Sequence, residues 1–445
     1  MAVTQPLPIS IYGAGPAGSA LAFLLASKSI AVRLHRWEYR RTLAEETLIP
    51  ASAQLVQRLG LGRALDSFME SKPLRHGIQW GGEWTWREGD YASPRVARGA
   101  FDRVLVEAAV SAGATLIDCQ GPPTEQTVRD GGLAVMATGS LTSCRGWTFA
   151  EEAQALVPTV ALVAMIREDA GTRDSSVIEA VPEGWWWWLP VSEGATMCVL
   201  VADANEVRTR GARQVWSAAR SHAAGPCHDA PEQNDAGRVA TSWRRTSRSV
   251  FLAGDAACRL DPLSSQGIEK ALASAEQLAA ALARGHAHPE ELHKLRDFMR
   301  RWDAGLFRAH ARKTLAFYAA EARFGGAPFW VARHAAAKQV LGGAAPISPS
   351  SPLRVSRTIR FVDAYRFVEG ELTPHRACAA DDDGPALAEL GGIPTEMWLA
   401  LIEGGQTLAD AVGKASKHPT FVAQSPAGVA RQLGELTRLG FLSSD

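Results

Sequence analysis

Two glycine-rich turns carry residues whose types and spacing could do chemistry. The first turn is Gly13-Ala14-Gly15-Pro16-Ala17-Gly18, between an apolar strand and a helix rich in Ala and Leu. Gly13 allows a sharp turn, Gly15 lets the backbone approach a diphosphate, and Gly18 lets the helix pack on the strand. The helix N-terminus then faces the negative charge. All six residues of this turn are predicted to bind a dinucleotide.

The second turn is Gly254-Asp255-Ala256-Ala257, followed by Asp261-Pro262-Leu263-Ser264-Ser265-Gln266-Gly267-Ile268. An aspartate between a strand and a helix is often only an N-cap. Here Gly254 and two alanines let a ligand come close, so that Asp255 can accept hydrogen bonds from ribityl hydroxyls. Pro262 to Gly267 lead into a helix at Ile268, whose N-terminus can stabilise negative charge on a reduced flavin. The two turns together predict bound FAD.

The end of the second strand departs from the dinucleotide pattern. The pattern expects an acidic residue that binds the adenosine ribose, but this chain has His35-Arg36, and Glu38 comes slightly late. His35 and Arg36 are therefore candidate contacts of the adenosine. For His35, an ordinary residue at the end of a strand is an equal alternative.

The order of the predicted elements defines the fold class. A βαβ opening implies a parallel sheet, and alternating segments within 160–203 predict an antiparallel sheet before the Gly-Asp turn. We expect an α/β fold: a discontinuous FAD-binding, Rossmann-like domain (1–74, 95–155 and 240–340), interrupted by a β-sheet substrate domain (75–94 and 156–239). A linker (341–369) would lead to a small winged-helix-like module with three short helices (370–445).

Composition excludes several classes of function. Lys+Arg and Asp+Glu both number 47, so a global electrostatic case for nucleic acid or for an anionic membrane is missing. No apolar run is long enough for a spanning helix, and the apolar start is interpreted as a strand. The six cysteines show no CxxC pair and are expected to be free thiols. We expect a cytoplasmic protein with no metal site.

Tryptophan is the unusual residue, with 14 in the chain. Four of them are consecutive, Trp185 to Trp188, in a predicted strand. Side chains alternate along a strand, so Trp185 and Trp187 share one face and Trp186 and Trp188 share the other. One pair would pack as core and the other would line a cavity, and the sequence leaves open which pair does which.

With these motifs, the chain resembles the FAD-dependent monooxygenases related to tryptophan halogenases and geranylgeranyl reductases. The resemblance covers about residues 8 to 340 and implies a fold like that of p-hydroxybenzoate hydroxylase and glutathione reductase. It implies that Glu46 and Arg98 contact the flavin cofactor and that the Gly184–Pro190 strand backs the flavin cavity. Its carriers are the two turns, Glu46-Thr47-Leu48-Ile49-Pro50, Arg98 to Arg103, Ala137-Thr138-Gly139, Gly184 to Pro190 and Gly254 to Leu272.

Within this group, Asp261 to Gly267 and Trp80-Gly81 are most similar to flavoproteins of tryptophylquinone cofactor biogenesis. That resemblance implies a protein or peptide substrate bearing Trp, in the course of making a quinone cofactor such as cysteine tryptophylquinone, with another maturation enzyme as a further partner. Halogenases carry a Lys where this chain has Leu74 to Ile78. Arg75 keeps its proton and Lys72 is out of register, so halogenation is disfavoured.

We therefore expect an FAD-dependent monooxygenase that uses O2 through a flavin C4a-hydroperoxide to hydroxylate a tryptophan side chain. Trp80, Trp187, His76 and Gln266 are the candidates for shaping or polarising the pocket. NAD(P)H or another reductant would supply the electrons. Two alternatives stay open: a hydroxylase or halogenase of a free small aromatic, and a redox-sensing flavoprotein whose winged-helix module docks to DNA or protein.

Overall fold

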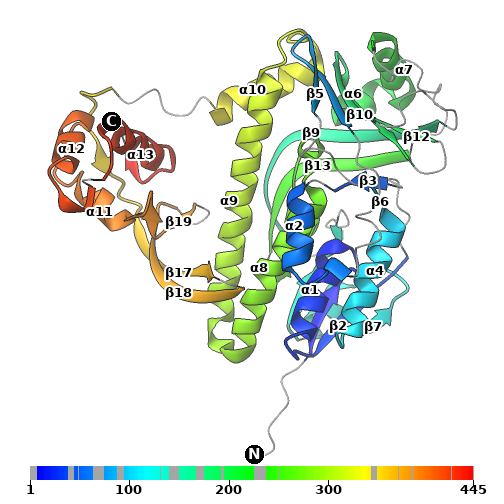
Figure 1. Ribbon diagram of the computed structural model, residues 1–445, viewed down its shortest axis with the longest axis horizontal. Coiled ribbons are helices and arrows are strands. Elements are labelled where there is room, and N and C mark those ends of the chain that lie inside the picture. The colour runs from blue at the N-terminus through cyan, green and yellow to red at the C-terminus, as the bar shows by residue number, and fades with distance from the viewer. Residues whose placement is uncertain are drawn as a thin grey trace, which may run out of the picture. The chain divides into compact units, whose positions relative to one another are not determined.

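The protein is described by a computed structural model. It covers residues 8–38, 45–48, 50–63, 75–87, 95–130, 132–139, 150–166, 175–191, 195–224, 237–248, 250–341, 348–368, 370–381, 384–421 and 423–443. The chain divides into two compact units. The first contains Met1–Ala283 and Ala309–Lys338, and the second contains Arg284–Arg308 and Gln339–Asp445 (Figure 1). Ile49, Lys72 and Leu74, which the sequence analysis singled out, lie outside the described residues.

One part of the first unit is built on a parallel sheet. Its strands, within the described residues, are ordered β14-β8-β1-β2-β7. They are β1 (Ile9–Tyr12), β2 (Val32–Arg36), β7 (Thr115–Asp118), β8 (Ala134–Met136) and β14 (Phe251–Leu252). The whole of β1 is buried, as expected for a central strand covered on both faces. The predicted α/β fold with a parallel sheet is confirmed.

Helices surround this sheet and carry the site residues. They are α1 (Pro16–Ala26), α2 (Pro50–Arg58), α4 (Arg98–Ser111), α5 (Glu125–Asp130) and α8 (Gly267–Ala287). Pro16 occupies the first turn of α1, where its missing N–H costs nothing. Two short strands, β3 (Glu45–Thr47) and β6 (Arg95–Ala97), pair antiparallel and lead into α2 and α4.

The second sheet of this unit is largely antiparallel. In the described chain its order is β15-β13-β9-β12-β11-β10-β4-β5, and β10 and β4 form a parallel pair within it. The bounds are β4 (Arg75–Trp80), β5 (Glu83–Arg87), β9 (Ala150–Ile166), β10 (Ser175–Val181), β11 (Gly184–Pro190), β12 (Thr196–Asp203), β13 (Gly237–Arg248) and β15 (Cys258–Arg259). The sheet therefore joins residues 75–87 to strands that follow much later in the chain.

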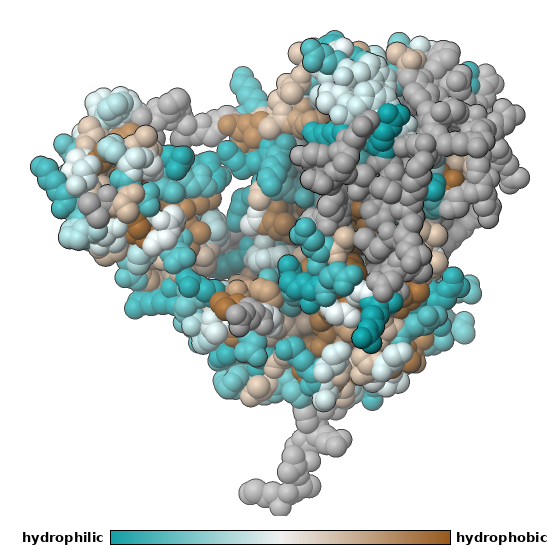
Figure 2. All heavy atoms as spheres, viewed as in Figure 1, coloured by the Kyte–Doolittle hydropathy of each residue, from teal (hydrophilic) through white to brown (hydrophobic). Residues whose placement is uncertain are grey.

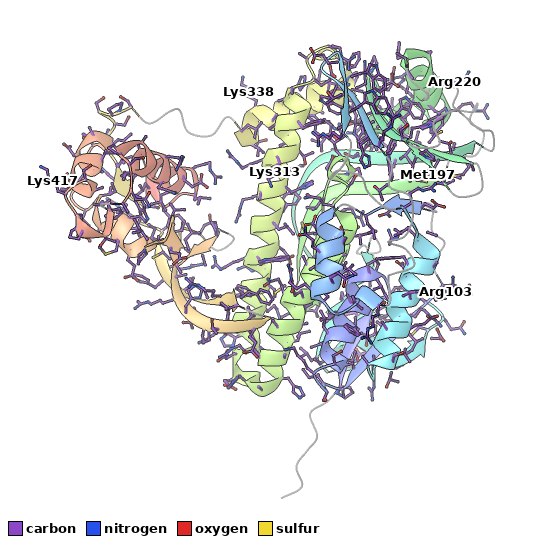
Figure 3. All side chains as sticks on the ribbon, viewed as in Figure 1. Arg103, Met197, Arg220, Lys313, Lys338 and Lys417 are labelled. Carbon is purple, nitrogen blue, oxygen red and sulfur yellow. The ribbon has the colours of Figure 1, made fainter. Side chains whose placement is uncertain are left out.

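One face of this sheet is covered by α6 (Ala204–Arg210) and α7 (Ala212–His222). Asp203 caps α6 by accepting hydrogen bonds from the N–H groups of Asn205 and Glu206, at 2.8 and 3.2 Å. Figure 3 shows Arg220 on α7 and Met197 on the neighbouring strand β12. Two long helices follow α8, namely α9 (Leu292–Ala319), whose residues up to Arg308 group with the second unit, and α10 (Pro328–Leu341).

The second unit has its own core, which includes Trp398, Phe421 and Leu433. The predicted helices are present as α11 (Thr395–Ala400), α12 (Leu408–Ala415) and α13 (Pro426–Arg438). Thr407 and Asp410 form a capping box that starts α12. The described strands are β16 (Arg354–Val355), β17 (Arg360–Val368), β18 (Glu371–Ala379), β19 (Ala386–Leu387), β20 (Glu389–Leu390), β21 (Ile393–Pro394) and β22 (Leu442–Ser443).

The structure adds two facts about the segments that join the predicted domains. Residues 354–368, within the predicted linker, contain β16 and β17, which are held by pairing with β22 and β18. Arg284–Arg308 groups with the C-terminal unit. Glu291 accepts a hydrogen bond from Tyr365 at 3.0 Å, and Lys294 pairs with Asp363 at 2.6 Å, which ties this helical segment to β17.

The described surface is mixed in character. Figure 2 shows hydrophobic residues scattered among hydrophilic ones over the described part of one face. No described helix combines the length and the apolar character needed to cross a membrane. Cys119, Cys198, Cys258 and Cys378 are free, as predicted, whereas Cys144 and Cys227 lie outside the described residues.

Candidate active site

A cavity of about 570 Å³ opens where the parallel sheet meets the second sheet. The turn after β1, the end of β2, the start of α4, the end of β8, the loop from β14 to α8, and β11 all contribute to its wall. Most of the predicted site residues line it: Gly13, Ala14, Gly15, Pro16, Ala17, Arg36, Glu46, Arg98, Trp187, Asp255, Pro262, Gln266, Gly267 and Ile268. The two turns, far apart in sequence, thus share one cavity.

The glycine turn forms a cradle that only these small residues allow. Gly13 has a φ of +118°, and a Cβ there would lie 2.3 Å from the carbonyl oxygen of Ala137. Gly15 faces open space, with no atom within 4 Å of the place that a Cβ would take. The backbone at the N-terminus of α1 is therefore accessible to an anion, and the helix dipole favours a diphosphate there. Gly18 is not among the described residues of the cavity wall; it packs against Gly13 and Ala137.

Gly254 lets the second glycine-rich turn pack closely against the first. Its φ is +61°, and a Cβ there would lie 2.7 Å from the Cβ of Ala17. Its N–H donates to the Ser274 hydroxyl at 3.1 Å. Gly254 thus contributes close packing of the two turns, while its neighbour Asp255 supplies the side chain that lines the cavity.

Asp255 is held between two cations that sequence reasoning did not identify. Lys270 Nζ lies 2.5 Å from Asp255 Oδ1, and Arg259 Nε lies 3.8 Å from Oδ2. Burial raises the pKa of Asp255, but Lys270 and Arg259 outweigh it and hold the pKa below its usual range. Because 43% of the Asp255 side chain is still exposed, the ionised carboxylate can accept hydrogen bonds from a ligand in the cavity.

Lys270 is itself almost completely buried, at 4% exposure, in the first turns of α8. Besides Asp255, its ammonium contacts the carbonyl oxygen of Cys258. It lines the cavity. A buried lysine requires a charge partner. The sequence signal that could have identified Lys270 is its charge at the start of an Ala-rich helix, after the Gly254-Asp255 turn.

Arg98 and Glu46 form an ion pair in the cavity wall. Arg98 begins α4, and its second terminal nitrogen lies 3.5 Å from Asp102 Oδ1, one turn further along the helix. Arg103, on the same helix (Figure 3), also lines the cavity. These side chains place both signs of charge beside the region where the phosphates of a dinucleotide would lie.

The end of β2 lacks the acidic residue that usually contacts the adenosine ribose, and its side chains are arranged differently. The His35 ring stacks on Tyr12, with centroids 4.4 Å apart, and its Nδ1 lies 3.7 Å from the Cys119 sulfur. His35 is not among the described residues of the cavity wall, whereas Arg36 and Trp37 are. Arg36 donates to Asp118 at 2.8 Å. The parallel pairing of β2 with β7 brings this carboxylate to the strand end, which the linear sequence could not show.

The structure decides which tryptophans of β11 face the cavity. Trp187 lines it and donates from Nε1 to the Ser176 hydroxyl at 2.9 Å. Trp185, on the same face, donates to the Tyr318 hydroxyl at 3.0 Å. Trp186 and Trp188 are fully buried under α6 and α7 and belong to the core that contains Trp216. The helices cover one face of the sheet, so the other pair is left for the cavity side.

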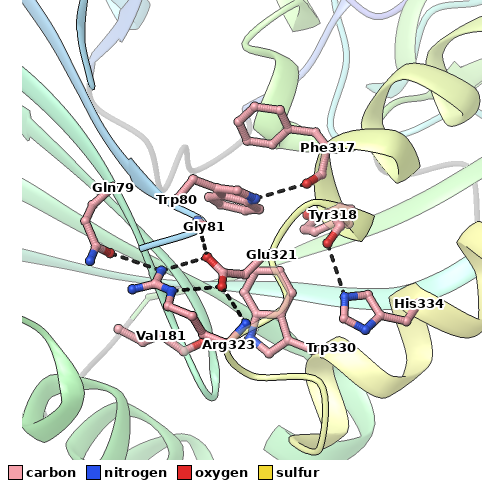
Figure 4. Close-up of polar contacts among 10 residues, drawn as sticks. All are labelled: Gln79, Trp80, Gly81, Val181, Phe317, Tyr318, Glu321, Arg323, Trp330 and His334. Carbon is pink, nitrogen blue, oxygen red and sulfur yellow. Dashed lines mark hydrogen bonds and ion pairs between the residues drawn. The ribbon is translucent and has the colours of Figure 1, made fainter. Parts of the chain in front are cut away.

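Trp80 and His76 are not among the described residues of the cavity wall. The Trp80 ring packs near Phe317, Tyr318 and Trp330, and its Nε1 donates to the Phe317 carbonyl at 3.0 Å (Figure 4). His76 is partly buried in β4, and burial and Arg87 lower its pKa. Both side chains therefore have structural surroundings that do not favour the predicted direct role in the pocket.

A buried carboxylate fixes the hairpin that carries Trp80. Glu321 accepts hydrogen bonds from the Gly81 N–H at 2.7 Å and from the Arg323 guanidinium at 2.6 and 2.9 Å (Figure 4). Its side chain is completely buried. Burial raises the pKa of Glu321, but these donors outweigh it and lower the pKa overall. The β4–β5 turn is thus anchored to the segment that follows α9.

A second buried carboxylate, Asp261, lines the cavity at the loop before α8. Tyr318 donates to both of its oxygens, at 3.0 and 3.1 Å, and the Leu263 N–H donates at 3.0 Å. Burial raises the pKa of Asp261 despite the opposing charge of Arg333. The Asp261 N–H donates to His310 Nε2 at 3.0 Å, so His310 presents an unprotonated nitrogen to this loop.

The fold and the cavity define the class of an FAD-dependent oxidoreductase. The open cradle at Gly15 fits a diphosphate, and the exposed carboxylate of Asp255 fits the hydroxyls of the ribityl chain. Residues 131–340 match the family model described as tryptophan halogenase. Together with the fold, this match confirms the predicted recognition: the protein is an FAD-dependent oxidoreductase, and its residues 131–340 are similar to the tryptophan halogenases.

Solved structures with the same fold include hydroxylating and halogenating enzymes. The peptidyl tryptophan dihydroxylase QhpG, essential for tryptophylquinone cofactor biogenesis, is 23% identical, with a TM-score of 0.67 over 98% of this chain and 100% of its own. The flavin-dependent halogenase CmlS is 18% identical, with a TM-score of 0.69 over 99% of this chain and 96% of its own. The myxobacterial chondrochloren halogenase CndH is 19% identical, with a TM-score of 0.56 over 76% of this chain and 90% of its own. No curated protein sequence matches the chain.

Proposed function

We propose that the protein is a monooxygenase that hydroxylates a tryptophan side chain of a protein or peptide. The observation that carries this proposal is the position of Trp187, an aromatic wall of the same cavity that contains Asp255 and the loop Pro262–Ile268. A flat apolar ring fits against such a wall. The likeness to QhpG, which acts on a peptidyl tryptophan, extends over nearly the whole chain and supports a polypeptide substrate.

Bound and reduced FAD would supply the activation of O2 and the transfer of one oxygen atom. The residues of this chain would hold the cofactor and orient the substrate. The Gly13–Ala17 turn would bind the pyrophosphate, Asp255 the ribityl chain, and the N-terminus of α8 at Gly267–Ile268 would stabilise negative charge on the reduced ring. An indole carbon is already nucleophilic, so orientation and exclusion of water are the main tasks of the protein.

Halogenation of an aromatic is the second candidate, because the family match and CmlS point toward it. The described cavity wall contains one lysine, Lys270. Its ammonium is paired with Asp255 and contacts the Cys258 carbonyl, so it offers no free amine to carry a halogen. Arg75 lies in β4 and stacks over Trp86, with its guanidinium 5.1 Å from the ring centroid. These contacts favour hydroxylation.

The test is a product analysis with the FAD-loaded protein. Reductant, O2 and bromide are supplied together with a set of tryptophan-containing peptides, with free tryptophan and indole as small-molecule controls. Addition of oxygen to a peptide tryptophan supports the proposal. A brominated product supports the halogenase alternative, and oxygenation confined to the free aromatics moves the substrate to a small molecule. Unchanged peptides after complete flavin turnover, also with the native partner protein, would contradict the proposal.

A reductant and a partner enzyme complete this proposal. NAD(P)H or another two-electron reductant would reduce the flavin, and a further maturation enzyme would act on the same polypeptide. We assign the C-terminal unit to binding of that polypeptide in preference to DNA, because the lysines and arginines on its helices are few. Measuring peptide affinity for the full chain and for a chain with substitutions on the exposed face of α13, such as Arg431→Glu, tests that assignment.

A further inference from the structure

We infer that Trp187 is itself a site of oxidative modification: in the absence of substrate, the enzyme hydroxylates its own Trp187 indole. This inference rests on the proposed function, because it uses the same oxygen-transfer chemistry. It follows from a property of the cavity wall. The residue that would contact an indole substrate is an indole, and it is as electron-rich as the substrate that the site is proposed to oxidise.

The four tryptophans of β11 differ sharply in their access to the cavity. Trp185, Trp186 and Trp188 are 2%, 0% and 0% exposed, whereas Trp187 is partly exposed and lines the cavity. The indole N–H of Trp187 is bound to the buried Ser176 hydroxyl at 2.9 Å. This bond uses the only polar atom of the ring and holds the ring in one orientation. The surface that Trp187 offers to the cavity is therefore carbon.

The position of Trp187 also determines which end of the cofactor it would meet. It shares the cavity with Pro262, Gln266, Gly267 and Ile268, the segment proposed to face the reactive ring of the flavin. The other tryptophan of the described cavity wall, Trp37, follows β2. The end of that strand binds the adenosine side of a dinucleotide in this type of fold. Oxygen transfer should therefore modify Trp187 and leave Trp37 unmodified, although both tryptophans line the same cavity.

The reaction balances with O2 and an added two-electron reductant. An indole carbon of Trp187 gives its π electron pair to an oxygen atom derived from O2, and a C–O bond forms as the O–O bond breaks. The two electrons of the reductant, together with two protons, bring O2 to the peroxide level before this transfer. The second oxygen atom leaves at the hydroxide level and takes the proton of the attacked carbon, which forms water and restores the aromatic ring. The polypeptide gains one oxygen atom.

The experiment uses the full-length, FAD-loaded protein without any substrate. The flavin is reduced with dithionite in the absence of air and then exposed to ¹⁸O2 in the presence of catalase, over several cycles. Flavin reoxidation is followed by absorbance, and peptides are then mapped by tandem mass spectrometry. We expect one ¹⁸O atom on Trp187, an amount that rises with the number of cycles, and none at the corresponding residue of Trp187→Phe.

Other tryptophans of the chain are built-in controls. Trp84 and Trp86 are 42% and 47% exposed in β5 and would report oxidation by free peroxide, while Trp37 reports the other end of the cavity. Equal labelling of Trp84, Trp86 and Trp187 overturns the inference, as does reoxidation of the flavin with Trp187 unlabelled. In the latter case the proposed function still stands if peptides are hydroxylated. A flavin that O2 does not reoxidise overturns both.

Discussion

Mild acid should destabilise the protein through His310, a buried histidine on α9. The residue is 5% exposed, and its Nε2 accepts a hydrogen bond from the Asp261 N–H at 3.0 Å. Burial is the main cause that lowers the pKa of His310 from 6.5 to about 4, and the charges of Lys270 and Lys313 add to it. Lys313 lies on the same helix (Figure 3). A proton on His310 would break its bond with the loop that lines the cavity.

The sign and the size of the effect follow from the two pKa values. Because the folded-state pKa is depressed, the unfolded chain binds more protons than the folded protein between pH 6.5 and about 4. The stabilisation is fully present above the unfolded pKa and is lost as the pH falls through this window. Linkage with these values gives a loss of about 2 kcal/mol at about pH 5 from this one residue.

The assay is urea unfolding at about pH 7 and about pH 5, followed by tryptophan fluorescence, for the natural protein and for His310→Gln. Gln keeps an acceptor for the Asp261 N–H but cannot titrate. We expect the variant to lose about 2 kcal/mol less than the natural protein between the two pH values. His35 and His76, whose pKa values are also lowered, contribute equally to both proteins and cancel. An identical pH dependence in the two proteins would refute the reasoning.

Three further predictions concern the cavity and its supports. Asp255→Asn should weaken FAD binding by about 1.5–3 kcal/mol, roughly ten- to a hundredfold in Kd, because charge-assisted hydrogen bonds are lost; a flavin fluorescence titration checks this, with Asp297→Asn, at an exposed position away from the cavity, as control. Gly254→Ala should destabilise the fold by about 1–3 kcal/mol because of its positive φ. Gly15→Ala should instead leave the melting temperature unchanged and lower FAD affinity; a lower melting temperature with unchanged FAD affinity would be inconsistent with a cradle at Gly15. Glu321→Gln should cost about 1.5–3 kcal/mol in urea unfolding, since it weakens bonds to a buried carboxylate, while Glu206→Gln, in a more exposed ion pair, should cost under about 1 kcal/mol.

Local sequence patterns were sufficient to predict the elements that form the two glycine-rich turns. The apolar strand, the Gly13–Gly18 turn and the following helix are adjacent in sequence, and their backbone requirements are set by the residues themselves. The same holds for Gly254-Asp255 and the start of α8. The period of two in β11 also indicated that Trp185 and Trp187 share a face. These features could be predicted because steric and hydrogen-bonding constraints act within a few residues.

Tertiary structure alone decided how the parts of the site meet. Trp187 faces the cavity because α6 and α7 cover the opposite side of the sheet, and no local pattern contains that choice. Lys270 reaches Asp255 across 15 residues of sequence, and Asp118 reaches Arg36 across 82. Trp80 packs against a segment more than 200 residues away. The sequence by itself determined which backbone turns can approach a dinucleotide; long-range packing determined which side chains, charges and aromatic faces surround it.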